Sequence, residues 1–255
     1  MSKTIAENDS AVLMDKKGER FLFFAKSGTM KIKGLGVFNP GELIGKNFYD
    51  YIEIGNRRYM LLEPSTVDKI LTIQRKAQII LPKDGMFIIF YCDIKSGDTV
   101  VEGGAGSGAL TILLANSVRP KGKIISYEER GEFAKIAQKN VDLAGLDEFV
   151  QIKKGDVTKK IPEKNVDAVV LDIPDPWDAL ENAVNSLKLG GHFASYSPTI
   201  NQVEKTVRKM RDYGFLGIKT LETLQREMIT GEGGVRPAYN ALGHTGYVTF
   251  GRKVV

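Results

Sequence analysis

The chain has 255 residues, of which 42% are hydrophobic and 26% are charged, a balance typical of a folded protein with one large domain or a domain and an appendage. Its formal net charge of +5 is too small to require a polyanionic partner, but it permits one such as RNA. No stretch reaches the roughly 18 consecutive apolar residues of a membrane span, and residues 1–10 have no apolar signal core, so we expect a cytoplasmic protein that does not enter a membrane.

Residues 1–72 are predicted to form a small N-terminal β domain. Ala11–Met14 and Arg20–Ala25 are apolar segments separated by a short charged turn, which predicts a β-hairpin. Ser65–Arg75 is predicted to be a helix that leads into the second domain, with its first residue or Thr66 as the N-cap.

Residues 73–255 are predicted to form a larger α/β domain, because short apolar strands alternate with helical stretches. The predicted strands are Thr99–Val101, Lys123–Tyr127, Val150–Ile152, Ala168–Leu171, His192–Tyr196 and Gly246–Phe250; the predicted helices are Ala109–Val118, Gly131–Ala144, Trp177–Leu187 and Asn201–Tyr213. This alternation predicts a parallel sheet with helices on both faces. Cys92 lies in an apolar, helix-like run and is the only cysteine, so we expect a buried thiol and no intrachain disulfide.

The most informative segment is the glycine turn Glu102–Leu110. Gly104, Gly106 and Gly108 follow a buried strand and precede a helix, so the backbone of the turn can come close to a nucleotide-like ligand. This pattern alone fits both a dinucleotide and S-adenosylmethionine (SAM).

Acidic residues follow the other predicted strands, at the edge where a doubly wound sheet binds its ligands. Glu128 would accept hydrogen bonds from ribose hydroxyls, which both ligands carry. Asp156 would accept one from an adenine amino group, which favours SAM. In Asp172–Trp177 two prolines stiffen a loop that presents a carboxylate and an aromatic ring, a pairing suited to holding a flat base.

These motifs resemble those of the tRNA (adenine-N1)-methyltransferases that modify adenosine 58 of the T-loop, above all the compact archaeal form. The resemblance covers nearly the whole chain. It is carried, in chain order, by Gln78–Asp84, Val101–Leu110, Ser126–Glu128, Gly155–Asp156, Asp172–Trp177, Gly190–Gly191, Arg236–Pro237 and His244–Tyr247.

The resemblance implies a class I, Rossmann-like SAM-dependent methyltransferase with a small N-terminal β domain, a tRNA partner and a homotetramer. SAM would be converted to S-adenosylhomocysteine, and no metal is predicted. The cofactor-binding residues it implies are Gln78, Ser107, Gly108, Ala109, Leu110, Glu128, Phe133, Asp156 and Asp172, and the glycine turn adds Glu102, Gly104 and Gly106; the resemblance also puts Asp172 between the cofactor and the target base. His244 and Tyr247, just before and within the last strand, are expected beside the target nucleotide; the alternative is that His244 is a hydrogen-bonded loop histidine with a structural role. The chain departs from some archaeal members in its lone Cys92, so intersubunit disulfides are not expected.

In the reaction expected from this resemblance, N1 of adenine attacks the methyl group in line. Asp172 would accept a hydrogen bond from the N6 amino group of the base and stabilise the positive charge that develops. Whether adenosine 57 is a second target stays open.

Three other functions compete with this interpretation. The first is a SAM-dependent methyltransferase for another RNA base, a protein or a small molecule. The second is an NAD-dependent oxidoreductase, for which the sequence offers no convincing Tyr–Lys or His–acid arrangement. The third is a non-catalytic RNA-binding subunit, against which the retained Glu128, Asp156 and Asp172 argue. Basic clusters such as Lys153–Lys154 would attract an RNA backbone.

Overall fold

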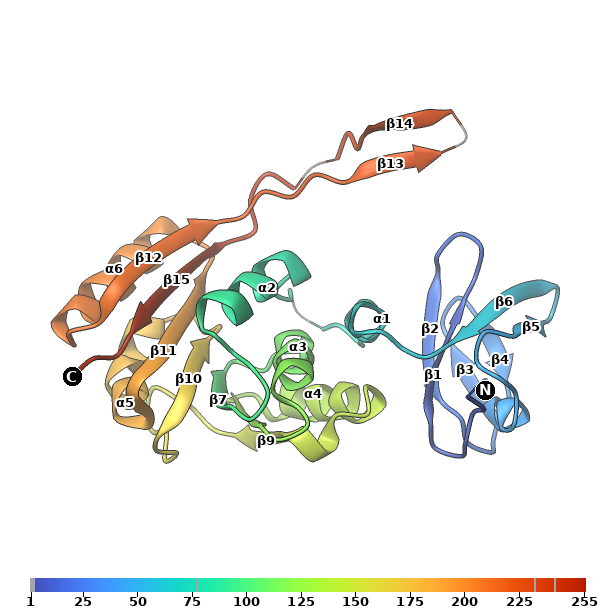
Figure 1. Cartoon of the computed structure of the whole chain (residues 1–255), viewed down its shortest axis with the longest axis horizontal. Coiled ribbons are helices and arrows are strands. Elements are labelled where there is room, and N and C mark those ends of the chain that lie inside the picture. The colour runs from blue at the N-terminus through green and yellow to red at the C-terminus, as the bar shows by residue number, and fades with distance from the viewer. Residues whose placement is uncertain (1–2, 77, 232, 241) are drawn as a thin grey trace.

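The computed structural model describes residues 3–76, 78–231, 233–240 and 242–255. The chain forms a small N-terminal β domain, a larger α/β domain and a two-stranded ribbon that projects from the larger domain (Figure 1). Within these residues, none of the helices has the length and apolar character that crossing a membrane requires.

The N-terminal domain is built on an antiparallel sheet with the strand order β2-β1-β6-β5. Its strands are β1 (Ser10–Met14), β2 (Arg20–Phe24), β5 (Tyr51–Ile54) and β6 (Arg57–Leu62), and β3 (Met30–Ile32) pairs separately with β4 (Gly36–Phe38). The predicted hairpin is confirmed, with Val12 opposite Leu22. Leu13, Phe23 and Tyr59 fill the domain core.

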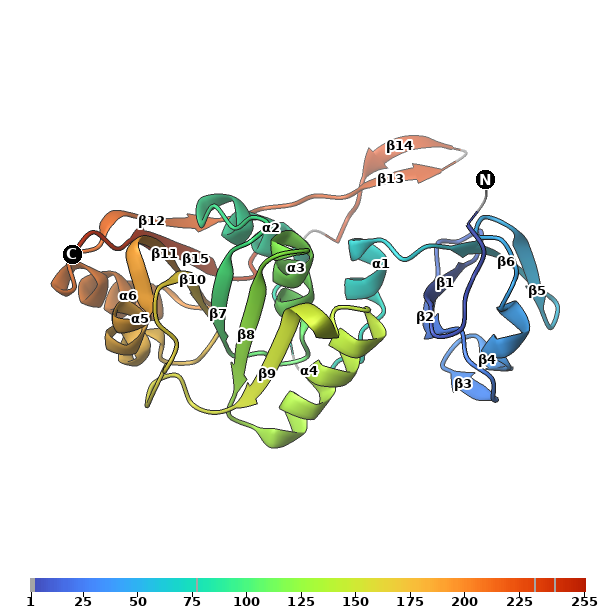
Figure 2. The same cartoon turned by 60° about the horizontal axis from the view of Figure 1, so that its bottom comes forward.

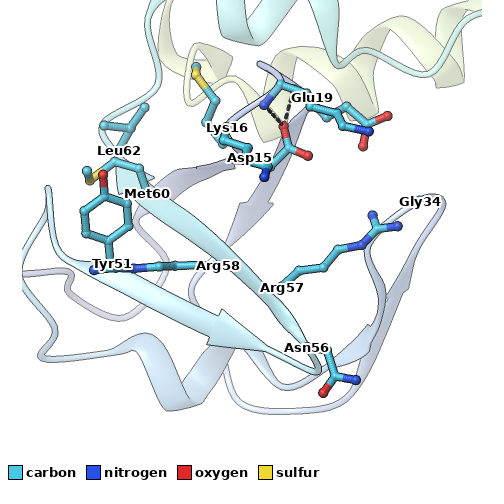
Figure 3. A pocket seen from close by; sticks show the side chains of 12 residues that line it. Asp15, Lys16, Glu19, Gly34, Tyr51, Asn56, Arg57, Arg58, Met60 and Leu62 are labelled. Atoms are coloured by element: carbon cyan, nitrogen blue, oxygen red, sulfur yellow. Dashed lines mark hydrogen bonds between the residues drawn. The ribbon is translucent and has the colours of Figure 1, made fainter.

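A groove of about 840 Å³ opens on this domain between the β1–β2 turn and the β5–β6 hairpin (Figure 3). Lys16, Lys17, Arg57 and Arg58 line it together with Tyr51. We call this feature the N-terminal groove.

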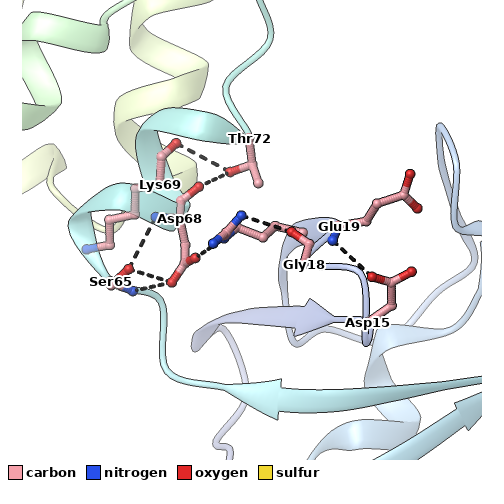
Figure 4. A network of polar contacts seen from close by, with 8 residues as sticks. Asp15, Gly18, Glu19, Ser65, Asp68, Lys69 and Thr72 are labelled. Atoms are coloured by element: carbon pink, nitrogen blue, oxygen red, sulfur yellow. Dashed lines mark hydrogen bonds and ion pairs between the residues drawn. The ribbon is translucent and has the colours of Figure 1, made fainter. Parts of the chain in front are cut away.

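The two domains are joined through helix α1 (Thr66–Leu71), whose N-cap is Ser65. Asp68 and the cap residue form a capping box, and the Asp68 carboxylate also accepts a 2.7 Å hydrogen bond from Arg20 Nε on β2 (Figure 4). The helix is shorter than predicted. It ends because the backbone N–H and C=O of Gln74 hydrogen-bond the side chain of Asn140 instead of continuing the helix.

We expect Asp68→Ala to lower the free energy of unfolding by about 2 kcal/mol, because it removes half of the capping box and leaves Arg20 without its buried acceptor. Thermal denaturation measures the effect. Glu204→Ala is the matched control, since Glu204 lies within helix α6, forms an exposed ion pair with Arg208 and should leave the melting temperature nearly unchanged. Equal melting temperatures for both variants would show that the contact contributes nothing.

The α/β domain contains a seven-stranded sheet with the order β12-β15-β11-β10-β7-β8-β9. Its strands are β7 (Thr99–Gly103), β8 (Lys123–Glu128), β9 (Val150–Lys154), β10 (Val166–Leu171), β11 (Leu187–Ser197), β12 (Leu216–Glu222) and β15 (Tyr247–Arg252). All six predicted strands are present, but the prediction of a parallel sheet is wrong at one edge. There β15 runs antiparallel to β11 and β12, because it returns from the projecting ribbon in the direction opposite to β12.

Helices pack on both faces of this sheet, as predicted. They are α2 (Pro82–Tyr91), α3 (Ala109–Val118), α4 (Gly131–Leu143), α5 (Leu180–Ser186) and α6 (Ile200–Asp212). The predicted helix Trp177–Leu187 begins instead as a 3₁₀ turn at Pro176–Ala179, and its last residue already belongs to β11. One core contains Ile88 and Ile112, and the other contains Leu180 and Met210.

Cys92 is buried in the first of these cores. Burial raises the pKa of its thiol far above the usual range, so the thiol stays protonated and unreactive. The prediction of a buried core thiol is confirmed.

The projecting ribbon was not predicted from the sequence. It consists of β13 (Met228–Gly231) and β14 (Gly234–Pro237), which pair antiparallel. In Figures 1 and 2 it extends away from β12 and β15, beyond α2. Large apolar side chains are exposed on it, including Val235 at 68% and the adjoining Tyr239 at 84%.

Candidate cofactor and base site

A cavity of about 580 Å³ lies at the carboxyl ends of β7, β8, β9 and β10. It is lined by six of the residues singled out from the sequence: Gln78, Gly104, Gly106, Glu128, Asp156 and Asp172. Four of the five segments that carry these residues follow parallel strands, which end at the same edge of the sheet, and Gln78 joins them from the segment before α2.

The first side of the cavity is the glycine turn. Gly104 has φ +91°, and a Cβ at this position would lie 2.0 Å from the carbonyl oxygen of Asp172. Gly108 has φ +83° and packs against the backbone of Ala137. The turn can thus lie directly on the β10 loop and on α4 only because these residues are glycine.

Glu128, at the end of β8, fixes the backbone of the glycine turn by hydrogen bonding. Its Oε2 accepts a 2.8 Å hydrogen bond from the backbone N–H of Gly106, and its Oε1 accepts 3.1 Å bonds from the backbone and the Nε of Arg130. A carboxylate has about four acceptor positions, so it retains capacity for a further donor in the cavity.

Asp156 lies on the loop after β9. Its Oδ1 accepts hydrogen bonds from the backbone and the hydroxyl of Thr158, at 2.9 and 2.6 Å. The hydroxyl bond, with help from Lys159, holds the pKa of Asp156 below its usual value. The carboxylate is therefore ionised at neutral pH and acts as an acceptor.

Asp172 follows β10 and is the most perturbed acid of the cavity. Its backbone N–H donates to the carbonyl of Gly103, which fixes it beside the turn. Burial, reinforced by the charge of Glu128, raises the pKa of Asp172 to about 7. Among the described residues no group hydrogen-bonds its carboxylate. Asp172 thus presents a carboxyl that changes charge near neutral pH and is free to accept from a ligand.

Glu102 lies beneath the turn and is absent from the cavity lining. Its Oε2 accepts 2.6 Å hydrogen bonds from the hydroxyls of Thr111 and Ser126, and burial raises its pKa to about 7. It braces β7 against α3 and β8.

The start of α3 also lies behind the cavity lining. Ser107, Gly108, Ala109 and Leu110 are buried there, and the Ser107 carbonyl accepts from Asn140. Phe133 is buried below the guanidinium of Arg130, which lies 3.8 Å from the ring centre.

His244 and Tyr247 lie outside the cavity lining, where the ribbon joins β15, with ring centres 4.9 Å apart. Both nitrogens of His244 are bonded, Nδ1 to the Glu222 carboxylate at 2.6 Å and Nε2 to the Pro198 carbonyl at 2.8 Å. Both partners offer acceptor oxygens, and the bond to Glu222 raises the pKa of His244. Because both ring nitrogens are engaged by the protein, neither is directed at the cavity in this arrangement.

Sequence reasoning assigned no role to several lining residues: Tyr127 and Ile173, which lie within the quoted motifs, and Thr158, which lies outside them. They line the cavity because they flank the strand ends, and the hydrogen bonds from Thr158 to Asp156 appear only in the structure. Trp177, which the loop pattern suggested as a base-stacking ring, does not line the cavity; Lys205 of α6 lies 4.5 Å from its ring centre.

Residues 59–233 match the family described as "tRNA methyltransferase complex GCD14 subunit". The chain is 40% identical to a tRNA (adenine(57)-N(1)/adenine(58)-N(1))-methyltransferase of Methanocaldococcus jannaschii, over 94% of each chain. It is 29% identical to the tRNA (adenine(58)-N(1))-methyltransferase of Thermus thermophilus, over 95% of this chain and 96% of the relative.

Two crystal structures have the same fold over nearly the whole chain. A SAM-dependent O-methyltransferase of Thermotoga maritima is 35% identical with a TM-score of 0.86, covering 99% of this chain and 95% of that one. The tRNA (m1A58) methyltransferase of Aquifex aeolicus is 29% identical with a TM-score of 0.79, covering 99% of this chain and all of that one. The Rossmann-like methyltransferase fold expected from the motifs is confirmed, and the chain belongs to the family of tRNA methyltransferase complex GCD14 subunits.

Proposed function

We propose that this protein is a SAM-dependent enzyme that methylates N1 of adenosine 58 in the T-loop of tRNA. The observation that carries the proposal is that one cavity gathers the glycine turn and the three acids predicted from the sequence, Glu128, Asp156 and Asp172, in a chain 40% identical to a relative named for adenosines 57 and 58. That relative's name makes adenosine 57 a second position to examine.

The cavity suits SAM in three respects. Gly106 lines the cavity, and no atom lies within 4 Å of the place that a Cβ would take there, so a ligand can contact the backbone at this residue. Glu128 has spare acceptor capacity for ribose hydroxyls, and the ionised Asp156 suits the adenine amino group. When bound, SAM supplies an electrophilic methyl group. Glu102, Ser107, Gly108, Ala109, Leu110 and Phe133 would then shape the site from behind rather than by direct contact.

Asp172 is the residue we assign to the target base. The lone pair on N1 of adenine lies in the ring plane, so methylation needs orientation and exclusion of water rather than a strong base. An ionised Asp172 accepts a hydrogen bond from the N6 amino group and stabilises the positive charge that the base acquires. His244 would have a structural role near the base, because both of its ring nitrogens already hydrogen-bond the protein. Tyr247, whose ring lies next to that of His244, would pack beside it.

The first test is methyl transfer from labelled SAM to an unmodified tRNA transcript, with nucleoside analysis of the product. Label in 1-methyladenosine at position 58 is the expected result. The Thermotoga maritima structure, described as an O-methyltransferase, favours the alternative of an oxygen acceptor. Label that is absent from tRNA but enters a protein or a small molecule would overturn our proposal in favour of that alternative.

We also propose that tRNA contacts the N-terminal groove. Four cations line the groove against two carboxylates, Asp15 and Glu19. None of the four cations forms an ion pair within the described part of the chain. The guanidinium of Arg58 lies 3.8 Å from the centre of the Tyr51 ring (Figure 3), an arrangement on which a base can stack.

We expect the double substitution Arg57→Ala/Arg58→Ala to weaken tRNA binding about tenfold near 0.1 M salt and to reduce the slope of log Kd against log salt by about 1 to 2. Filter binding over a salt series measures both. Lys31→Ala/Lys33→Ala removes the same charge from exposed positions outside the groove and should change Kd less than about twofold. If the two double variants weakened tRNA binding equally, the groove cations would act only through the net charge of the protein, and the proposed contact would be wrong.

A homotetramer in the cytoplasm, without intersubunit disulfides, completes the proposal. The exposed apolar side chains of the ribbon and the burial of the lone Cys92 support it. Sedimentation equilibrium under reducing and oxidising conditions tests it, and the same mass of four chains is expected in both.

A further inference from the structure

A buried ion pair stands at the start of α2. Lys83 Nζ lies 2.8 Å from Asp84 Oδ1, and their side chains are only 7% and 0% exposed. A buried ion pair is costly unless further hydrogen bonds satisfy both partners. Here Lys83 also donates to the carbonyl of Thr223 at 2.7 Å and to the hydroxyl of Thr245 at 2.6 Å. That hydroxyl in turn donates to Asp84 Oδ2 at 2.9 Å, so the group is fully bonded.

These contacts tie together three separate parts of the chain. Thr223 directly follows β12, and Thr245 lies two residues before β15. Residues 223–245, which we call the arm, therefore have both ends attached to α2. Figure 1 shows α2 below the point where β12 and β15 lead into the arm.

Thr245 also connects this group to Tyr196, which lies beside Asp172. In the parallel pairing of β10 and β11, Leu171 lies beside Ser195, so Tyr196 is next to Asp172 at the end of the sheet. The Tyr196 hydroxyl donates a 2.5 Å hydrogen bond to the carbonyl of Thr245. Gly246 has no room for a Cβ, which would lie 2.4 Å from the Tyr196 ring. The C-terminal end of the arm, at Thr245, therefore packs directly against Tyr196, the neighbour of Asp172.

We infer that Lys83, Asp84 and Thr245 form a positioning clasp, which fixes both ends of the arm beside Asp172 and so sets the wall against which the target base is oriented. This inference rests on the function proposed above. The clasp acts through Tyr196 and the arm and does not touch the reacting atoms. It gives a role to Lys83 and Asp84, which belong to the motif Gln78–Asp84 but do not line the cavity.

Thr245→Val tests the clasp with little change in volume, since it removes only the hydroxyl that links Lys83 to Asp84. With saturating SAM and tRNA, we expect the single-turnover rate of methyl transfer to fall at least about tenfold, because small displacements of the base are costly to the rate. The Kd for SAM should stay within about twofold of the unsubstituted protein. Thr245→Ser, which keeps the hydroxyl, should restore the rate to within about threefold.

Amide hydrogen exchange supplies an independent readout. We expect exchange next to residues 223 and 245 to rise at least about fivefold in Thr245→Val, with exchange in β7 and β8 unchanged. Thr220→Val is the matched control: Thr220 shares a 2.9 Å hydroxyl contact with Thr249 on the same two strands, away from the arm. This variant should keep the wild-type transfer rate.

The inference is overturned if Thr245→Val transfers methyl groups at the wild-type rate, if Thr245→Ser fails to restore the rate, or if Thr220→Val is equally slow. Faster exchange with an unchanged rate overturns it as well, because the clasp would then hold the arm without serving the reaction. A wild-type protein that forms no 1-methyladenosine is a different result and refutes the proposed function itself.

Discussion

Asp172→Ala should reduce the rate of methyl transfer to tRNA at pH 8 by about 100-fold or more, with SAM binding retained. The loss is large because the variant lacks both the acceptor for the base amino group and the charge that stabilises the methylated base. Asp172→Asn keeps an acceptor oxygen but not the charge, so an intermediate loss of about tenfold is expected. Single-turnover rates and SAM titrations of the three proteins separate these contributions. Near-normal turnover of Asp172→Ala would exclude this role.

The pH dependence of the same proteins gives a second expected result. Since burial and Glu128 raise the pKa of Asp172 to about 7, kcat/KM of the wild-type enzyme should rise from pH 6 to pH 8 as the carboxyl ionises. Asp172→Asn should lack this rise. A rise that persists in Asp172→Asn would assign the titration to another group, of which Glu102 is the nearest in pKa.

The raised pKa of Asp172 also makes the free energy of unfolding depend on pH. A carboxyl with a pKa near 4 when unfolded and about 7 when folded holds its proton more tightly in the folded state, so the folded state loses stability as the pH rises from about 4 to about 7. Asp172→Asn avoids this loss and should therefore be more stable than the wild type at pH 8, by about 4 kcal/mol, since one pKa unit corresponds to about 1.4 kcal/mol. At pH 4 the two should melt alike. Glu102 is present in both proteins and does not affect the comparison.

Gly104→Ala should abolish SAM binding and lower the free energy of unfolding by about 3 kcal/mol or more. An added Cβ would lie 2.0 Å from the Asp172 carbonyl oxygen, so the glycine turn and the β10 loop must separate. The substitution also forces a residue with a side chain to adopt φ +91°. Isothermal titration with SAM and thermal denaturation measure the two effects.

Gly97→Ala separates the clash from the backbone strain. Gly97 has φ +98°, close to that of Gly104, but a Cβ there meets no atom within 4 Å. Its variant should lose only about 1 to 2 kcal/mol and should bind SAM as the wild type does. If Gly104→Ala bound SAM with unchanged affinity, the close contact between the turn and the β10 loop would have no part in forming the site.

The glycine turn and the acids at the strand ends could be predicted from the sequence for a local reason. A strand, a glycine turn and a helix are set by neighbouring residues, and parallel strands place their carboxyl ends together whatever their order in the sheet. The sequence therefore predicts Glu128, Asp156 and Asp172 at one edge of the sheet without any knowledge of strand pairing, and the three line one cavity. The buried thiol of Cys92 followed in the same way from its apolar neighbours.

The arm and the clasp could not be predicted in this way. The arm begins and ends where β12 and β15 pair. This pairing joins residues 216–222 to residues 247–252, and no local sequence pattern specifies it. Lys83 and Asp84 resemble the solvated start of an ordinary helix, but the ends of the arm bury them. Its place in the sequence predicts His244 beside the target base, but both of its ring nitrogens hydrogen-bond the protein, to Glu222 and to the Pro198 carbonyl.

The fold class, the glycine turn and the residues at the strand ends can be read from local sequence, because hydrophobic periodicity and turn chemistry act over a few residues. Three further features emerge only when distant segments pack together: Gly104 lies against Asp172, the buried Glu102 braces β7, and Thr245 links α2 to the arm. Each of these depends on burial and on contacts between distant segments, which also raise the pKa of Asp172 to about 7.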